Sequence, residues 1–135
     1  MAYSLSTLNG VNKTNTSKLK KAGVGSVESL LKAGGTKKGR KDLATSTKIN
    51  EKTLLKWVNM ADLCRIKGVS KKYSELLEAA GVDTVKELKT RKPENLVEKM
   101  EKVNKRKKLV KQTPGVKNVK GWVTHAKKLK PMVKY

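Results

Sequence analysis

The sequence contains few of the residues from which covalent, metal-bound and catalytic centres are built. Among its 135 residues there is one cysteine, Cys64, and one histidine, His125. A single cysteine excludes an internal disulfide framework, and one cysteine with one histidine cannot form a tetrahedral zinc site of those two residue types. Any nucleophilic triad would need His125 as its base, and no partner for it is evident. We therefore expect neither an enzyme nor a cofactor or metal site.

Long apolar runs and aromatic side chains are also scarce. No apolar run approaches the roughly 20 residues that a membrane-spanning helix needs, and the first ten residues, MAYSLSTLNG, lack the apolar segment of a signal peptide. There is no phenylalanine, and only 4% of the residues are aromatic. This composition disfavours a surface that stacks single-stranded bases. We expect no membrane partner and no small-molecule substrate.

Acidic residues are outnumbered by basic ones. There are 33 Lys and Arg against 11 Asp and Glu, and the formal net charge is +22. Self-repulsion at this charge density destabilises a compact chain unless a polyanion neutralises it. The apolar fraction of 36% is low for a globular domain, yet above that of a disordered basic tail. Nucleic acid is the first candidate partner, ahead of an acidic protein.

An internal repeat relates the two halves of the chain. Residues 5–30 read LSTLNGVNKTNTSKLKKAGVGSVESL, and residues 63–88 read LCRIKGVSKKYSELLEAAGVDTVKEL, with ten identities at an offset of 58. A looser correspondence follows at an offset of 65, where Trp57-Val58 with Ala61 matches Trp122-Val123 with Ala126. We interpret the chain as two repeats, residues 1–61 and 62–135.

Capping residues and glycines predict helices throughout. One helix is expected from Asn12 to Ala22 and another from Ser70 to Ala80, each followed by a glycine that suits a helix end. Further helices are expected over 50–65, 83–88, from Pro93 onward and over 119–129. The segment 34–41, GGTKKGRK, is expected to be a flexible loop. No stretch alternates with period two, so we predict an all-α protein.

Each repeat carries the same five-residue turn between two predicted helices: LNGVN at 8–12 and IKGVS at 66–70. The glycine permits a sharp turn with positive φ and the close approach of another surface. The valine after it anchors the turn in the core, and Asn12 or Ser70 can cap the following helix. The amides at the positive end of that helix then form an anion site. Lysines flank both turns, namely Lys13, Lys71 and Lys72.

These turns resemble the hairpin of the helix-hairpin-helix motif, apolar-x-Gly-apolar-Gly, with Asn12 and Ser70 in place of the last glycine. The run KWVNMADLCRIKGVSKKYSELLEAAGVDTVKEL is similar to an uncharacterised family of tandem helix-hairpin-helix domains, and the similarity covers most of the chain. The resemblance implies two helix-hairpin-helix repeats packed as one compact, pseudo-symmetric all-α domain that binds the DNA backbone without reading bases. The implied phosphate contacts are the backbone groups of Gly10, Val11, Asn12, Gly68, Val69 and Ser70.

Two clusters of basic residues are further candidate contacts to nucleic acid. The first is in the segment 34–41, which lacks the GxxxxGK[ST] pattern of a nucleotide-binding P-loop; it comprises Lys37, Lys38, Arg40 and Lys41. The second is in the run 102–111, which we expect to form a mostly polar, phosphate-tracking helix; it comprises Lys105, Arg106, Lys107 and Lys108. The alternatives are a solvated surface for either cluster and a localisation signal for the second.

The distribution of charge differs between the hairpins. Residues 1–61 carry a net charge of +9 and residues 86–135 carry +13, whereas residues 62–85 hold four basic and four acidic residues. The second hairpin is therefore expected to lean towards a structural role. Trp57, Trp122 and Tyr73 are expected in the core, and Cys64 is expected to be a small buried hydrophobe.

The hypothesis that follows is a non-enzymatic protein that binds double-stranded DNA through phosphates, largely independently of sequence, in an architectural or packaging role. It would act inside the cell or virion, on DNA in a nucleoid, chromatin or viral nucleoprotein. Two alternatives stay open: a protein–protein accessory or scaffold module, and an RNA-binding component of a ribonucleoprotein. The oligomeric state is open as well.

Overall fold

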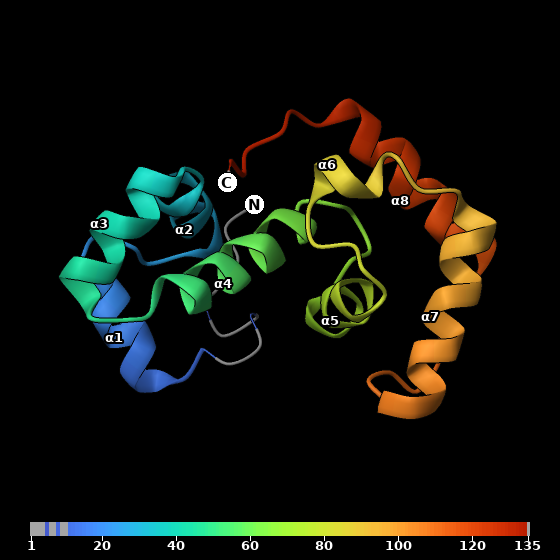
Figure 1. The fold of residues 1–135 in the computed structure, drawn as a ribbon, viewed down its shortest axis with the longest axis horizontal. Helices are drawn as coiled ribbons and strands as arrows, with labels where there is room; N and C mark the ends of the chain where they lie inside the picture. Colours follow the sequence, from blue (N-terminus) through green and yellow to red (C-terminus); the bar gives the residue numbers. More distant parts are fainter. Residues whose placement is uncertain (1–4, 6–7, 9–10, 135) are drawn as a thin grey trace. The chain divides into compact units, whose positions relative to one another are not determined.

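The computed structural model describes Leu5, Leu8 and residues 11–134. Within them the chain forms eight α-helices and no β-strand (Figure 1), which confirms the all-α class. The helices are α1 (Lys13–Lys21), α2 (Val27–Gly34), α3 (Lys37–Thr47), α4 (Glu51–Leu63), α5 (Lys71–Ala79), α6 (Val85–Leu88), α7 (Pro93–Lys107) and α8 (Val116–Lys128). The chain divides into two compact units, which we call unit 1 (Met1–Asp62 with Met132–Tyr135) and unit 2 (Leu63–Pro131).

Helices α1 and α5, which correspond in the repeat, end in the same way. The residue after each C-cap is a glycine in the left-handed region, Gly23 with φ 87° and Gly81 with φ 94°. The next amide then reaches back to the helix, from Val24 to the Leu19 carbonyl and from Val82 to the Leu77 carbonyl, both at 2.8 Å. These are Schellman ends, and only glycine adopts the required φ without strain. Superposition of the two whole repeats stays a prediction.

The helices that follow these ends also begin alike. The Ser26 hydroxyl accepts a hydrogen bond from the Ser29 amide at 3.1 Å and caps α2. The Thr84 hydroxyl, 58 residues later, accepts from the Glu87 amide at 3.3 Å and caps α6. The short helix expected over 83–88 is thus present as α6, capped by Thr84, and helix α2 is its counterpart in unit 1.

Most of the segment 34–41 is helical, because α2 ends at Gly34 and α3 begins at Lys37, so the expectation of a flexible loop is wrong. Helix α3 starts at Lys37, where the Thr36 hydroxyl accepts a hydrogen bond from the Gly39 amide at 3.0 Å. Lysine and arginine are good helix formers, and one side of α3 buries Arg40, Leu43 and Thr47. Because α3 packs against both α1 and α2, tertiary contacts outweigh the three glycines of the segment.

The basic run 102–111 is only partly helical. Helix α7 ends at Lys107, and Lys108 adopts a left-handed conformation with φ 49°. Its amide donates a hydrogen bond to the Asn104 carbonyl at 2.8 Å, which closes the last turn. The chain then leaves the helix direction, so the expected single helix through Lys111 is wrong. The last helix, α8, begins at Val116, directly after Pro114-Gly115 and three residues earlier than expected.

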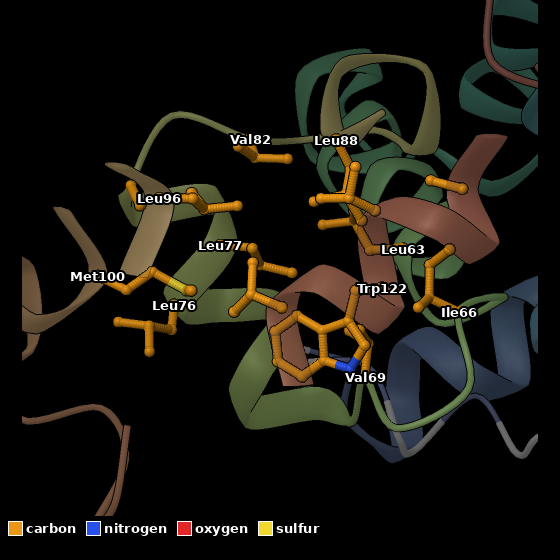
Figure 2. Packing of buried hydrophobic residues seen from close by; sticks show 14 of the residues in the cluster. Leu63, Ile66, Val69, Leu76, Leu77, Val82, Leu88, Leu96, Met100 and Trp122 are labelled. Atoms are coloured by element: carbon orange, nitrogen blue, oxygen red, sulfur yellow. The ribbon is translucent and has the colours of Figure 1, made fainter. Parts of the chain in front are cut away.

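The core of unit 2 forms where α5, α6, α7 and α8 meet (Figure 2). Leu76, Leu77 and Met100 approach from one side of the Trp122 indole, and Leu63 and Ile66 approach from the other. Trp122 is 5% exposed, and its ring centroid lies 5.5 Å from that of Tyr73. The aromatic pair is tilted by 52°, a favourable geometry for two rings.

All but one of the residues predicted for the core are buried, each within its own unit: Leu19, Val24, Val27 and Trp57 in unit 1, and Leu77, Val82, Val85 and Trp122 in unit 2. Tyr73, also expected in the core, is only partly buried. Cys64 is also buried, as expected. Burial raises the pKa of its thiol to about 11, while a hydrogen bond with Ser74 lowers it. The thiol is therefore protonated and unreactive at neutral pH.

None of the helices in the described residues has the length and apolar character that a bilayer crossing requires.

Truncation of Leu77, which is fully buried, tests the core of unit 2. Leu77→Ala should lower the free energy of unfolding by about 2–5 kcal/mol, because a buried cavity replaces packed methyl groups. Urea denaturation followed by circular dichroism measures the change. Leu109→Ala, at a partly buried position, is the control and should cost less. Equal destabilisation of the two variants would contradict this core assignment.

The pair Asp83 and Glu87 makes stability depend on pH. Partial burial, a hydrogen bond with Glu87 and repulsion by its charge raise the pKa of Asp83 to about 6. Desolvation acts to raise the pKa of Glu87, but hydrogen bonds from Asp83 and Arg91 outweigh it and lower that pKa. The Arg91 guanidinium lies 2.7 Å from the Glu87 carboxylate. The folded protein thus keeps the Asp83 proton to a higher pH than the unfolded chain does.

The proton on Asp83 stabilises the folded protein. This stabilisation is fully present below the pKa that Asp83 has in the unfolded chain, and it is lost as the pH rises through about 6. Asp83→Asn should therefore gain stability relative to the natural protein between pH 5 and pH 8, by about 1 kcal/mol at most, because solvent screens this half-exposed pair. Urea denaturation at both pH values checks it, with Glu75→Gln as the control. A difference that does not change with pH would argue against the shared proton.

Candidate functional site

The turn between α4 and α5, which we call hairpin 2, consists of residues 66–70. The Ile66 amide donates to the Leu63 carbonyl and the Val69 amide donates to the Ile66 carbonyl, both at 3.1 Å. Ile66 and Val69 are buried, whereas Gly68 between them is exposed and has φ 93°. Two apolar anchors therefore hold the turn, and its glycine faces solvent in a conformation that other residues rarely adopt.

Two residues of helix α8, Trp122 and His125, contact hairpin 2. A Cβ atom on Gly68 would lie 3.1 Å from Nε1 of Trp122, so the turn and the indole are in close contact. One turn further along α8, His125 accepts a hydrogen bond at Nδ1 from the Lys67 amide, at 3.2 Å. The sequence offered His125 no partner, and the structure gives it this one. Its role is to position the hairpin.

The start of α5 is open at hairpin 2. Ser70 has the extended backbone of an N-cap, but its side chain accepts no hydrogen bond from the first turn, so the expected cap by Ser70 is wrong. The first amides of a helix have no partners inside the helix, and they carry the positive end of its dipole. Exposed Lys67 and Lys72 lie beside them in the chain. The side chain of Lys71 lies outside the described residues.

The corresponding turn in unit 1, hairpin 1 (residues 8–12), is capped. The Val11 amide donates to the Leu8 carbonyl at 3.4 Å, as its counterpart does in hairpin 2. The Asn12 side chain accepts from the Asn15 amide at 2.9 Å, which is the cap predicted for it. Gly10 lies outside the described residues. Lys13 is exposed at the start of α1, but one amide of this first turn is already occupied.

The cluster on α3 separates into exposed and buried residues. Lys37, Lys38 and Lys41 are exposed, whereas Arg40 is only 4% exposed. The Arg40 guanidinium donates to the Gly34 carbonyl at 2.8 Å and to the Lys134 carbonyl at 2.6 Å. Arg40 therefore links α3 to Lys134 within unit 1 and, unlike the three lysines, is not exposed for the contact with nucleic acid that the sequence suggested. The signal in the sequence was the spacing of Arg40 with Leu43 and Thr47 on one helix side.

The lysines of α3 and those of α7 occupy opposite helix ends. Lys37 and Lys38 lie in the first turn of α3, where the helix dipole disfavours cations. Helix stability therefore does not explain them. The basic residues at the end of α7 are exposed and favourably placed for the dipole; they are Lys105, Arg106 and Lys107, followed by Lys108 as the C-cap.

Unit 2 thus brings together Gly68, Ser70 and the open start of α5 at one exposed turn. The α3 lysines belong to unit 1, and the basic end of α7 is a separate part of unit 2. Within the residues that the structure describes, no group of three or more His, Cys, Asp or Glu side chains could hold a metal ion.

These features define an all-helical protein with a glycine turn at an uncapped helix start. The sequence model of the family described as "Domain of unknown function (DUF4332)" matches residues 9–129, so the chain belongs to that family. No curated protein and no solved structure matches the chain.

Proposed function

We propose that this protein binds the phosphate backbone of double-stranded DNA, without catalysis and largely without reading base sequence. The observation that carries the proposal is the exposed, uncapped start of α5 behind Gly68. Amides at such a helix start point towards solvent and attract an anion through both hydrogen bonds and the helix dipole. The turn accordingly functions as a helix-hairpin-helix phosphate site in unit 2.

The small side chain of Ser70 is compatible with this role. The motif has glycine at that position, which lets a phosphate approach the amides closely. Serine adds one hydroxyl group, which is free of the capping bond that would block the first turn. In hairpin 1, by contrast, the Asn12 side chain occupies the Asn15 amide. The caps favour hairpin 2 as the principal phosphate site, although the local charge balance in the sequence favoured the first.

The net charge supports the same class of partner. Lysines are exposed on α3, α7 and α8, and a formal charge of +22 favours binding driven by counterion release. Such contacts position a protein on DNA but carry no base information. The role that fits is architectural or DNA-packaging, in a nucleoid, chromatin or viral nucleoprotein.

The affinity for duplex DNA should fall steeply with salt. About five to nine phosphate contacts give a slope of roughly −4 to −8 in a plot of log affinity against log salt concentration. Fluorescence anisotropy with two duplexes of scrambled sequence measures the slope and should give similar affinities. Lys37→Ala with Lys38→Ala should reduce the slope by about one unit for each phosphate that these lysines neutralise in the natural protein. Tighter binding to single-stranded DNA or to duplex RNA would overturn the duplex DNA assignment.

Ser70→Asp tests hairpin 2 directly. An aspartate at the N-cap accepts the first-turn amides and places a negative charge where the phosphate would bind, while it favours the helix itself. We expect the affinity for duplex DNA to fall about tenfold or more, a loss of about 1.4 kcal/mol or more.

The matched control for Ser70→Asp is Asn95→Asp, which adds the same charge to the exposed first turn of α7 in the same unit. Its effect should be no more than about twofold, because only net charge changes. Ser70→Asn, which changes no charge but supplies the cap seen in hairpin 1, should also weaken binding. Equal weakening by Ser70→Asp and Asn95→Asp would show that hairpin 2 is only a helix connection.

A further inference from the structure

After α7 the chain reverses and forms a short strap, residues 108–113, beside the end of the helix (Figure 1). Asn104, in the last turns of α7, holds the strap with both atoms of its amide. Its Nδ2 donates to the Val110 carbonyl and its Oδ1 accepts from the Val110 amide, both at 3.0 Å. These two hydrogen bonds fix the backbone of Val110 against the last turns of α7.

A second anchor holds the far part of the strap. The Tyr73 hydroxyl donates to the Gln112 carbonyl at 3.3 Å, and the Tyr73 ring packs on Trp122. Leu109 and Val110 are partly buried against the core of unit 2. The strap is therefore fixed by polar contacts at two positions and by apolar packing. A surface held in this way is preorganised for a ligand.

A hollow of about 420 Å³ lies against the strap and the end of α7. It is lined by Glu101, Asn104, Lys105, Lys111, Gln112 and Thr113. The volume falls within the range of sites for small ligands, roughly 300–1,000 Å³. Every lining side chain is polar, and the amide of Asn104 is already used by the strap.

The hollow contains two lysines and one carboxylate, that of Glu101. Neither Lys105 nor Lys111 forms an ion pair with a carboxylate of the described residues, whereas Lys102 on α7 lies 3.5 Å from Glu98. The helix dipole accounts for Lys105 near the end of α7. The dipole does not account for Lys111, which belongs to the strap and lines the same hollow. With two lysines against one carboxylate, the lining keeps a net positive charge, which favours an anion bound between the lysines.

We propose that this hollow binds the phosphate monoester of a nucleotide. The dianion would lie between Lys105 and Lys111, since two ammonium groups match its charge. Glu101, Gln112 and Thr113 offer an acceptor and mixed donors for the hydroxyl and amine groups of the sugar and base. The site goes beyond the proposed function, because it is separate from hairpin 2. The phosphate could belong to a free nucleoside monophosphate or to the phosphorylated end of a strand.

Titration of the ¹⁵N-labelled full chain with adenosine monophosphate, adenosine and inorganic phosphate tests the site. The monophosphate should shift the amide signals of residues 101–113, and adenosine should not, because it lacks the charge. Phosphate alone should shift the same signals more weakly. Shifts spread evenly over the lysine-rich helices, or none at all, would overturn the proposal.

A charge-matched pair of variants separates the hollow from diffuse charge. Lys105→Ala with Lys111→Ala should weaken monophosphate binding about tenfold or more, because both charge-assisted hydrogen bonds are removed. Lys117→Ala with Lys120→Ala removes the same charge from exposed positions of α8 and should change the affinity by about twofold or less. Circular dichroism checks the fold of both. Equal weakening in the two variants would overturn the site.

Two further measurements decide between the ligand sources and between the two proposals. If the source is a strand end, a duplex with 5′-phosphates should bind more tightly than the same duplex with 5′-hydroxyls, and Lys105→Ala with Lys111→Ala should abolish the difference. If it is a free nucleotide, the two duplexes should bind alike. Ser70→Asp should leave monophosphate binding unchanged. If Ser70→Asp does not weaken duplex DNA binding while the hollow still binds the monophosphate, only the proposed function is refuted. If Ser70→Asp weakens duplex DNA binding but the monophosphate does not bind, only the nucleotide site is refuted.

Discussion

The packing of Trp122 connects the features of unit 2 that bear on function. Its indole is buried among leucines, and a Cβ atom on Gly68 would lie only 3.1 Å from its Nε1. Its face contacts Tyr73, whose hydroxyl in turn holds the strap after α7. One large aromatic group therefore supports the hairpin, the start of α5 and the strap together. Because aromatic side chains bury large areas at a low cost in conformational entropy, a single tryptophan can hold three segments in this small unit.

The high net positive charge of the chain opposes its compact folding. Among the described residues, the ion pairs Glu87–Arg91 and Glu98–Lys102 are solvent-accessible i,i+4 pairs of small value, so they offset little of the +22 charge. Stability must come from the leucine and valine cores and from well-capped helices. The one buried guanidinium, that of Arg40 in the described residues, is satisfied by two carbonyl groups. Hydrogen bonds to charged donors are strong enough to offset part of the cost of removing that charge from water.

The two hairpins show how one local difference changes what a repeated motif offers a ligand. Both turns use the same two backbone bonds, three residues apart along the chain. Asparagine caps the helix in unit 1, whereas serine leaves the helix start open in unit 2. A cap stabilises its helix by using the donors that an anion would need. The proposed division of labour, with hairpin 2 as the phosphate site, follows from this competition.

The sequence by itself determined the helical class, the helix ends at Gly23 and Gly81 and the buried positions of both tryptophans. These features depend on local backbone preference and on apolar spacing, which residues near in sequence decide. Only the tertiary structure decided that residues 37–41 are helical, that Arg40 is buried and that the chain turns back after Lys107. Arg40 finds its acceptor at Lys134, and Tyr73 finds its acceptor at Gln112. Contacts between residues so far apart in the chain leave no periodic pattern in the sequence, because they depend on how the packed helices bring distant backbone groups together.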